Sequence, residues 1–423
     1  MNSRFFLFLF SFCFLPVFVG YGNDISSWIA VARENNADIL KARAELQAAI
    51  AKIPQAKSLP DPMIEFETMG TDTIGSGQSA LFMQNFPWPG TLRQKGSKAA
   101  FEARSAWHSV QTIELQVISR IRIIATEIAY LQKERNFIQE NLILFQKQED
   151  FLAQTARTGG NISDLVRVEI ESSLLEDELA RSQEKIRREI AELEALTGST
   201  IPPDASFSIE KFSSVSTSAK LPEQEALSAK LETHNPFLQS LSNRIDAARA
   251  GATIARLETY PEFMIAAGYQ RIKEMGHMAG GDEWMDEGVL MFSVSLPIWK
   301  EKNKGKRSES TALLEAALQE REAASRALRA QLTILLSRAR DASRRIQLYQ
   351  DRLLPKARQS HETLESAYKT NKSTLLDVFD SRRRLLETET GYWRAITDFH
   401  VNRAQIDSLF GSEIQLSEIN SYK

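Results

Sequence analysis

Few residues in this chain have the types and spacings that catalysis or metal binding needs. The sequence has no nucleophile, phosphate-binding or zinc-protease motif, and its histidines lack the spacing of metal ligands. We therefore expect no enzymatic activity, no cofactor and no dedicated metal site. The weak candidates for a soft metal are Met275, His277 and Met278, which lie in a stretch (273–288) typical of an acidic loop.

Two aspartates, Asp377 and Asp380, are three residues apart near the expected start of a helix. This spacing places both carboxylates on one helix face. Acids at a helix start can simply favour the helix dipole. In a symmetric assembly, each would instead form a ring of carboxylates, and such rings select for cations. The spacing alone leaves both interpretations open.

The composition excludes several classes of protein. Among 423 residues, 43% are hydrophobic and 25% are charged, which is inconsistent with a disordered chain. A formal net charge of -3 gives no basic excess for nucleic-acid binding. Only 13 Pro and 19 Gly interrupt the chain, so long helices are expected.

The first 22 residues have the pattern of a signal peptide. Arg4 precedes an aromatic, apolar run (5–19), and small residues follow at 20–22. We expect cleavage near Gly22 and export of the chain. Cys13 is the only cysteine and lies in this segment, so a disulfide scaffold and thiol catalysis are excluded.

The rest of the chain repeats itself. Asn36 recurs as Asn235, and Pro62 recurs as Pro261 at the same spacing. We predict a first structural repeat at 23–198, a linker at 199–222 and a second repeat at 223–423, with the extra residues of the second repeat in a longer loop.

Each repeat should consist of a helix, two short strands and a long helical hairpin. The helical stretch from Leu92 to Ala156 contains one glycine and no proline, and heptad seams run along both repeats. The hairpin tips are predicted at about 158–164 and 370–375, where Gly and Asn can end a helix and Ser163 and Thr374 can cap the next. The seams are Ala106, Val110, Ile113, Val117, Ile121, Ile124, Ile128 and Leu131, and Leu328, Leu332, Leu335, Ala339, Ala342, Ile346, Tyr349 and Leu353.

Four segments alternate between apolar and polar residues, at about 62–71, 79–88, 261–271 and 288–298. Their length and their aromatic ends are typical of transmembrane β-strands. A small amphipathic sheet packed on helices is the alternative. Four strands cannot close a barrel, which needs about eight, so membrane strands would require further subunits. Three copies would give about twelve strands.

Four stretches of this sequence resemble one known family. In their order, and with the repeat and the helix lengths, they resemble the TolC family of outer-membrane efflux proteins over nearly the whole chain, and most of all its heavy-metal branch. The stretches are LPDPMIEF (59–66), QNFPWPG (84–90), SLPIWKEKNKG (295–305) and YKTNKSTLLDVFDSRRRL (368–385).

This resemblance implies a mainly α fold with a small membrane β part. The two-repeat protomer would form a homotrimer with a twelve-strand β-barrel in the bacterial outer membrane and an α-helical barrel in the periplasm. The family supplies passive exit ducts for an inner-membrane pump, joined through a periplasmic adaptor, so heavy-metal cations are candidate substrates. A secreted periplasmic coiled-coil adaptor or scaffold without membrane strands remains the alternative.

The resemblance also implies roles for single residues. Asp377 and Asp380 match two acids that narrow the periplasmic end of the duct in this family. The family's glycine at the second tip is Asn371 here, and the first repeat has Val166 and Glu169 where the second has its acids. A full second pair of rings is therefore not expected. The tips would dock the adaptor through Gly159, Gly160, Asn161, Ser163, Leu165, Asn371, Lys372, Ser373, Thr374 and Leu375.

Overall fold

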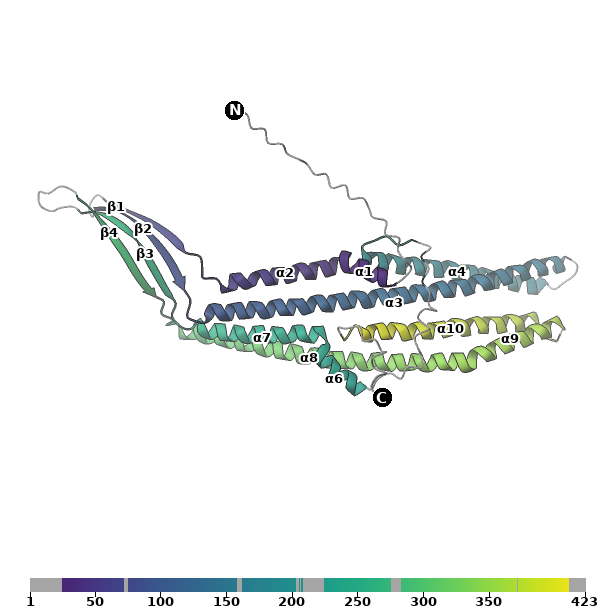
Figure 1. The fold of residues 1–423 in the computed structure, drawn as a ribbon. Coiled ribbons are helices and arrows are strands. Elements are labelled where there is room, and N and C mark those ends of the chain that lie inside the picture. Colours follow the sequence, from purple (N-terminus) through teal and green to yellow (C-terminus); the bar gives the residue numbers. More distant parts are fainter. Residues whose placement is uncertain are drawn as a thin grey trace, which may run out of the picture.

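The computed structural model describes residues 25–71, 75–157, 162–202, 205, 207, 224–274, 283–370 and 372–410. The predicted signal peptide and most of the predicted linker lie outside these residues. The described chain is a long rod with a small sheet at one end and helices along the rest (Figure 1). None of the described helices combines the length and the apolar composition needed to cross a membrane.

Four antiparallel strands form a single sheet at the end of the rod. They are β1 (Met63–Thr71), β2 (Gly75–Phe86), β3 (Phe263–Glu274) and β4 (Glu283–Val294). Their order in the sheet is β1-β2-β3-β4. The second strand of one repeat therefore pairs with the first strand of the other, and within the described chain β1 and β4 each have one unpaired edge.

The strand bounds differ from the predicted ones. The alternation predicts 79–88 and 288–298 for β2 and β4, but both strands begin and end earlier. β2 ends directly before Pro87, which has no N–H for a strand ladder. β4 ends at Val294, which pairs with Phe263, the first residue of β3. β3 likewise covers 263–274 instead of 261–271, and part of the predicted loop at 273–288 is strand.

Polar cross-strand contacts explain why the second hairpin extends past its apolar alternation. Arg271 faces Asp286 across β3 and β4, and the two form an ion pair at 3.2 Å. The Arg271 guanidinium also lies 5.2 Å from the centre of the Trp284 ring. Polar and cation–π pairs across strands stabilise a sheet as apolar pairs do, but they produce no alternation of apolar and polar residues in the sequence.

The helices follow the predicted order of each repeat. The first repeat contains α1 (Ile25–Asn35), α2 (Ala37–Lys57), α3 (Thr91–Ala156) and α4 (Ile162–Thr197). The second contains α6 (Gln224–His234), α7 (Pro236–Leu257), α8 (Lys300–Leu348), α9 (Leu354–Lys369) and α10 (Leu375–Asp407). The structure confirms the long uninterrupted helix predicted from Leu92, since α3 starts one residue earlier and ends at the same Ala156.

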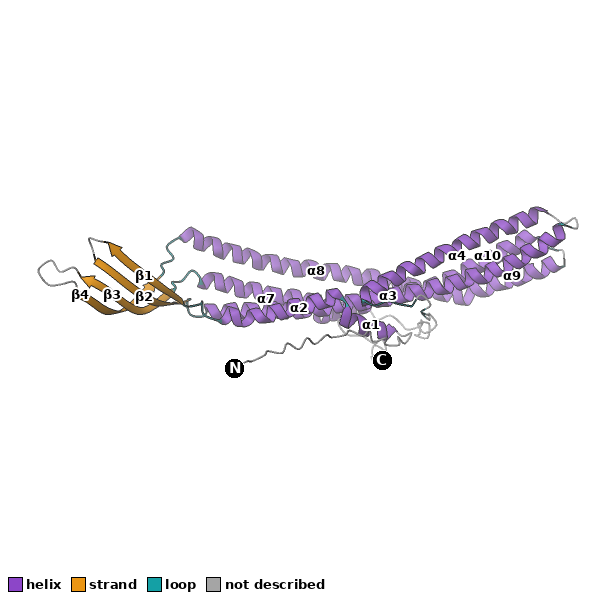
Figure 2. Cartoon of the chain, turned by 90° about the horizontal axis from the view of Figure 1, so that it is seen from above, coloured by secondary structure: helices purple, strands orange, loops and turns teal. Residues whose placement is uncertain are grey.

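The helices pack as neighbours in a regular order. Near the sheet, α2 packs on α3, α3 on α7 and α7 on α8, which is the order of the strands that join them. Toward the far end, α4 packs on α3, α3 on α10 and α10 on α9. The short helices α1 and α6 lie beside the middle of the rod (Figures 1 and 2).

Most of the predicted seam residues pack where the two repeats meet. Leu353 is an exception: it is 38% exposed and Leu354 is buried instead, because residues 349–353 form a π-helical turn that changes which side chain faces the core. Ile121, Ile124, Leu332 and Ala339 are each 0% exposed, and all belong to one core cluster. Alanine at the seam leaves room for close helix approach. A second, smaller cluster lies between α3, α4 and α10 and includes Ile138, Leu142, Phe145, Val168, Leu175, Leu375 and Phe379.

The repeated asparagines close the two repeats in the same way. The Asn36 side chain accepts hydrogen bonds from the first turn of α2 and donates to the carbonyl of Leu196, at the end of α4, at 2.9 Å. Asn235 likewise caps α7 and donates to the carbonyl of Leu409, just after α10, at 2.8 Å. Both side chains are buried. A single amide therefore starts one helix and fixes the end of another.

One irregularity separates α8 from α9. Residues 349–353 form a π-helical turn, in which the N–H of Leu354 donates to the carbonyl of Tyr349. Pro355 follows at once and has no N–H, so the regular ladder is interrupted here. Opposite this turn is Gly391 of α10, where an added Cβ would lie 2.6 Å from the Tyr349 hydroxyl oxygen. A glycine in α10 therefore makes room for Tyr349.

Candidate functional site

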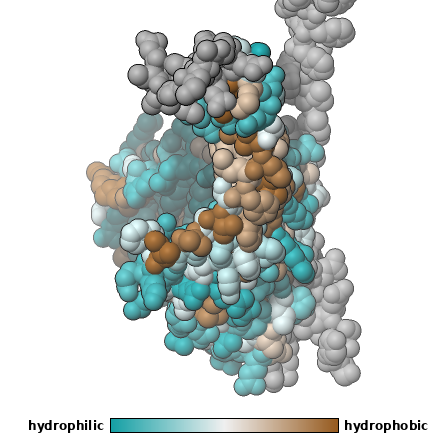
Figure 3. Space-filling view, turned by 90° about the vertical axis from the view of Figure 1, so that its left-hand side faces the viewer, coloured by the Kyte–Doolittle hydropathy of each residue, from teal (hydrophilic) through white to brown (hydrophobic). Residues whose placement is uncertain are grey.

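The pairing register assigns the sheet's side chains to two different faces. Ile64, Phe82 and Leu290 share one row across the strands, and Ile265 and Phe292 share the next row on the same side. We call this side the apolar face. Leu290 is 78% exposed and Ile64 is 64% exposed. Figure 3 looks onto the sheet end and shows hydrophobic side chains gathered there. An exposed apolar face on short strands is typical of contact with lipid.

The opposite side, called here the polar face, carries charged and small residues together with methionines, Leu81 and Val289. Glu67, Ser79, Gln270 and Glu287 form one row across all four strands. Gly268 lies on the same face, and a Cβ there would lie 2.1 Å from the carbonyl oxygen of Ala80. If lipid covers the apolar face, this face is directed at water.

Aromatic residues mark the junction between the sheet and the helices. Trp88 stacks on Tyr260 with ring centres 4.9 Å apart and on Phe263 at 5.9 Å. Trp299, just before α8, is 70% exposed. These are the aromatic strand ends noted in the sequence, and Trp and Tyr are residue types that are enriched where lipid meets water.

Asp377 forms part of a capping box at the start of α10. The Thr374 side chain accepts from the N–H of Asp377 at 3.2 Å, and the Asp377 carboxylate accepts from the N–H of Thr374 at 2.9 Å. Hydrogen bonds from the side chain and backbone of Thr374 lower the pKa of Asp377. Thr374 therefore caps α10 as predicted, and Asp377 has a structural role that does not depend on a ring of carboxylates.

Asp380 is exposed and lies one turn further along α10. It lines a cavity of about 480 Å³ between α10, α4 and α3. Arg167 of α4 and Arg383 of α10 line the same cavity, and Phe379 contributes to its apolar wall. The ring of Phe379 stacks on Phe145 of α3 at 4.8 Å. Asp380 thus has charged neighbours from both hairpins.

The tip candidates differ in accessibility. Gly159, Gly160, Asn161 and Asn371 lie outside the described residues. Leu375 is 5% exposed and packs in the small cluster, so its side chain is unavailable to a partner. Ser163 was expected to cap α4, but α4 begins at Ile162, and Ser163 lies inside its first turn.

The remaining tip residues are closer to the surface. Lys372 is exposed, and Leu165 is half-buried. Ser373 is also half-buried, and its hydroxyl donates to the carbonyl of Leu364 at 3.0 Å.

An exposed apolar stripe on α4 was missed by the sequence reasoning. Ile162, Val166, Ile170 and Leu174 recur every four residues and are 46–66% exposed. This spacing aligns them along one helix face. The same spacing in the sequence would have revealed the stripe, but burial in the protomer cannot be judged from spacing alone.

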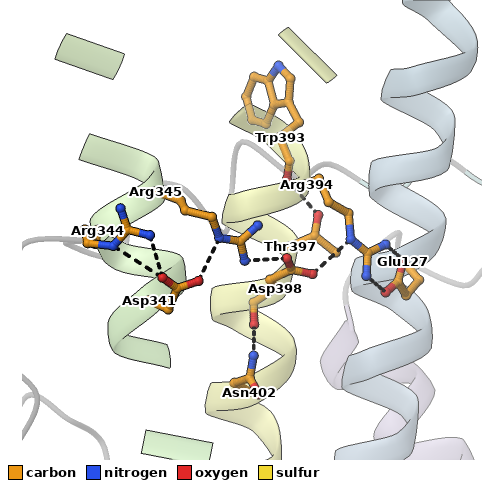
Figure 4. Close-up of polar contacts among 9 residues, drawn as sticks. All are labelled: Glu127, Asp341, Arg344, Arg345, Trp393, Arg394, Thr397, Asp398 and Asn402. Carbon is orange, nitrogen blue, oxygen red and sulfur yellow. Dashed lines mark hydrogen bonds and ion pairs between the residues drawn. The ribbon is translucent and has the colours of Figure 1, made fainter. Parts of the chain in front are cut away.

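A polar network joins three helices in the middle of the rod (Figure 4). Asp398 of α10 accepts from Arg345 of α8 at 2.7 Å and from Arg394 at 2.9 Å. Arg394 also donates two hydrogen bonds to Glu127 of α3, at 2.9 and 3.0 Å. Burial alone would lower the pKa of Arg394, but Glu127 and Asp398 outweigh it and raise this pKa. The network fixes α10 between α3 and α8.

The described residues offer no obvious centre for metal chemistry. No group of three or more His, Cys, Asp or Glu side chains among them could hold a metal ion. The weak candidates Met275, His277 and Met278 lie outside the described part of the chain.

Comparison with known proteins relates this chain to outer membrane efflux proteins. Residues 227–412 match the family model described as outer membrane efflux protein. The cobalt-zinc-cadmium resistance protein CzcC of Cupriavidus metallidurans is 22% identical over 396 residues, covering 90% of this chain and 88% of CzcC. The family model therefore matches the second repeat, and the similarity to CzcC extends over nearly the whole chain.

Solved structures show the same fold as this chain. The structure of CusC matches with a TM-score of 0.76 at 16% identity, covering 92% of each chain. The open-state outer membrane channel MtrE of Neisseria gonorrhoeae matches with a TM-score of 0.75 at 16% identity, covering 92% of this chain and 89% of MtrE. The matches confirm the mainly helical fold with a small four-strand sheet.

Proposed function

We propose that this chain is an outer membrane efflux protein, and that three copies of it form one continuous channel, with a twelve-strand barrel in the outer membrane and a helical barrel in the periplasm. The observation that carries this proposal is the open sheet, with its exposed apolar face and its unpaired β1 and β4 edges. Unpaired backbone groups cost several kcal/mol each in lipid, so these edges need partner strands. Four strands per copy are also too few to close a barrel.

The helices support the same assembly. α4 packs on α3 and lies at one edge of the far half of the rod. Its apolar stripe, which includes Ile162 and Leu174, is exposed in a single chain. A neighbouring copy would cover this stripe, just as a neighbouring strand would cover the edge of β1.

The channel would be the exit duct of a tripartite system. In this proposal, an inner-membrane pump delivers its substrate through a periplasmic adaptor, which docks on the hairpin tips. The name of the relative CzcC suggests heavy-metal cations as substrates. The exposed residues Ser163 and Lys372 remain the best described candidates for adaptor contact.

Asp380 is the better candidate for a ring at the constriction. Its carboxylate is exposed, whereas Asp377 already accepts hydrogen bonds from the helix cap. Three copies of Asp380 would concentrate negative charge at one level of the channel, which favours cations. The cap role of Asp377 is compatible with a second ring but does not require one.

Assembly and conduction test this function directly. Mass photometry of the detergent-solubilised chain should give three times the mass of one chain, and planar bilayers should show stable conductance. A chain that stays soluble and monomeric without detergent would instead favour the periplasmic scaffold and would contradict the channel.

The ring can be tested without disturbing the cap. Asp380→Asn should lower the preference for cations over anions in single-channel recordings and weaken block by trivalent cations. Glu176→Gln removes the same charge from an exposed position on α4 and is the matched control. Unchanged selectivity in Asp380→Asn would remove this residue from the constriction while leaving the channel intact.

A further inference from the structure

Methionine is distributed very unevenly in this chain. Nine methionines occur in the sequence, and all except Met1 lie in the two strand hairpins, at 63, 69, 83, 264, 275, 278, 285 and 291. None occurs in a described helix, although methionine is a good helix former. The helices instead take their apolar side chains from Leu, Ile, Val and Ala.

Five methionines of the strands also share one face. Met63, Met83 and Met291 lie in one row across the sheet with Ala266. Met264 lies two residues from Ala266, and side chains two apart in a strand point the same way. Met285 is six residues from Met291 along β4 and therefore on the same side. These five positions are on the polar face, together with Leu81 and Val289, whereas the methionines are absent from the apolar face of the described strands.

Three of these methionines are neighbours of one small residue, and a fourth lies one strand further. Met83 and Met291 flank Ala266 on the adjacent strands, Met264 lies two residues before Ala266 along β3, and Met63 flanks Met83 on β1. Adjacent strands are about 4.8 Å apart, so long side chains on both sides can converge above an alanine. Ala266 is 0% exposed although it faces away from lipid, which shows that its neighbours close over it.

The thioethers themselves are accessible. Met63 is 51% exposed and Met291 is 43% exposed, while Met83 and Met264 are half-buried. Side chains needed only for packing would be covered in the chain and would not require sulfur. Thioether sulfur is a soft ligand that favours soft ions such as Cu(I) over ions that prefer oxygen or imidazole.

We propose that Met63, Met83, Met264 and Met291 form a binding site for a soft monovalent cation of the Cu(I) or Ag(I) type on the polar face of the sheet. The site rests on the proposed function for its role: it would lie on the inner wall of the channel, on the path of an exported cation. Glu65, two residues from Met63 on the same face, adds negative charge that attracts cations to it.

Methionine methyl groups report directly on this site. The full chain, labelled with [methyl-13C]methionine and solubilised in detergent, has at most nine methionine methyl signals. Single Met→Leu variants assign them. One equivalent of silver nitrate per chain should shift the signals of Met63, Met83, Met264 and Met291, whereas one equivalent of Zn(II) should leave them in place.

A combined variant provides the affinity test. Leucine conserves the volume of methionine but has no sulfur, so Met63→Leu/Met83→Leu/Met264→Leu/Met291→Leu should keep the fold. We expect it to bind Ag(I) at least about tenfold more weakly in calorimetry, a change of about 1.4 kcal/mol. Met285→Leu, at a more distant row of the same face, is the matched control and should bind Ag(I) like the parent.

Three results would overturn the site: unchanged methyl signals with Ag(I), equal shifts with Zn(II), or shifts confined to Met275 and Met278. The titration is independent of the channel proposal, because all four methionines belong to one chain. A trimer that conducts but does not bind Ag(I) would reject the site alone. A chain that binds Ag(I) but never forms trimers would reject the channel alone.

Discussion

The two repeats have the same order of elements but differ in the continuity of their long helices. In the first repeat, α3 runs for 66 residues without interruption. In the second, α8 covers 49 residues, a π-helical turn covers five and α9 covers 16. The interruption coincides with Gly391 in the facing helix α10.

This difference suggests that the two repeats have different structural roles. α3 packs against α2, α4, α7 and α10, so one continuous helix contacts the helices of both halves of the rod. The second repeat contains the irregular features, which are the π-helical turn and the glycine opposite it. We infer that the first repeat acts as the scaffold and that the second is the more adjustable one.

The largest effect should come from truncating the core of the scaffold. Ile121 of α3 and Leu332 of α8 are both 0% exposed. Either change to Ala should cost about 2–5 kcal/mol, and we expect Ile121→Ala to cost more because α3 connects more elements. The thermal midpoint of the solubilised protein measures both. An equal or larger loss for Leu332→Ala would contradict this difference in roles.

A smaller effect should appear at the π-helical turn. Gly391→Ala puts a Cβ 2.6 Å from the Tyr349 hydroxyl oxygen, so the ring must move, at a cost of about 1–3 kcal/mol. The matched control is Gly251→Ala in α7, where an added Cβ meets nothing within 4 Å. That variant should be stabilised by about 0.5–1 kcal/mol, because alanine is the better helix former.

A second substitution identifies the cause of the Gly391 effect. Combining Gly391→Ala with Tyr349→Leu should recover part of the lost stability, since the hydroxyl that clashes is gone. Without any recovery, the clash would not be the reason for the loss.

The two asparagine caps should have equal effects of about 1–2 kcal/mol each. Asn36→Ala and Asn235→Ala each remove a helix cap and a buried hydrogen bond to a carbonyl. Guanidinium unfolding of the single variants would compare them. A clearly larger loss of stability in one of the two variants would show that the repeats also differ at these asparagine caps.

The smallest effect concerns the second tip. Hydrogen bonds from Thr374 lower the pKa of Asp377, so the ionised carboxylate stabilises the start of α10. This contribution is complete above the usual carboxyl pKa of about 4 and is lost as the pH falls through the lowered value. Amide exchange at 375–378, corrected for intrinsic rates, should therefore speed up in acid. Thr374→Ala should abolish most of this pH dependence, and an unchanged dependence would exclude the capping box as its source.

The sequence predicted the parts of the fold that depend on period and length. The heptad spacing located most of the buried seam residues. The absence of proline and the single glycine between Leu92 and Ala156 predicted the bounds of α3 to within one residue. The sequence did not predict the π-helical turn. Pro355 indicates that the helix is disturbed, but the position of the turn also depends on the contact of Tyr349 with Gly391, which lies far away in the sequence. The sequence also did not predict the hydrogen bond between Arg345 and Asp398. Charged residues are common along these helices, and their spacing does not indicate which of them pair.

The candidate sites show the same limit. Asp377 and Asp380 were recognised as a pair, but only the geometry shows that the first accepts hydrogen bonds from the cap. The strand methionines are easy to see in the sequence, but assigning them to one face requires the register of all four strands. Long-range register depends on pairing partners about 180 residues apart, which no local pattern encodes.

The pairing of β2 with β3 has a consequence for symmetry. Within one chain, this junction already joins the hairpin of one repeat to the hairpin of the other. In the proposed trimer, β4 would meet the next copy's β1 at a quasi-equivalent junction, so that six hairpins would stand in a pseudo-sixfold ring. The strand ends away from the helices lie at one level, because Thr71 pairs with Gly75, Gly77 with Ile272 and Glu274 with Glu283. The hairpins differ at the helix end instead, where β1 starts opposite Met83 and β3 starts opposite Phe86. The ring would therefore have an even outer edge, and three short strands would leave steps on the edge that faces the periplasm.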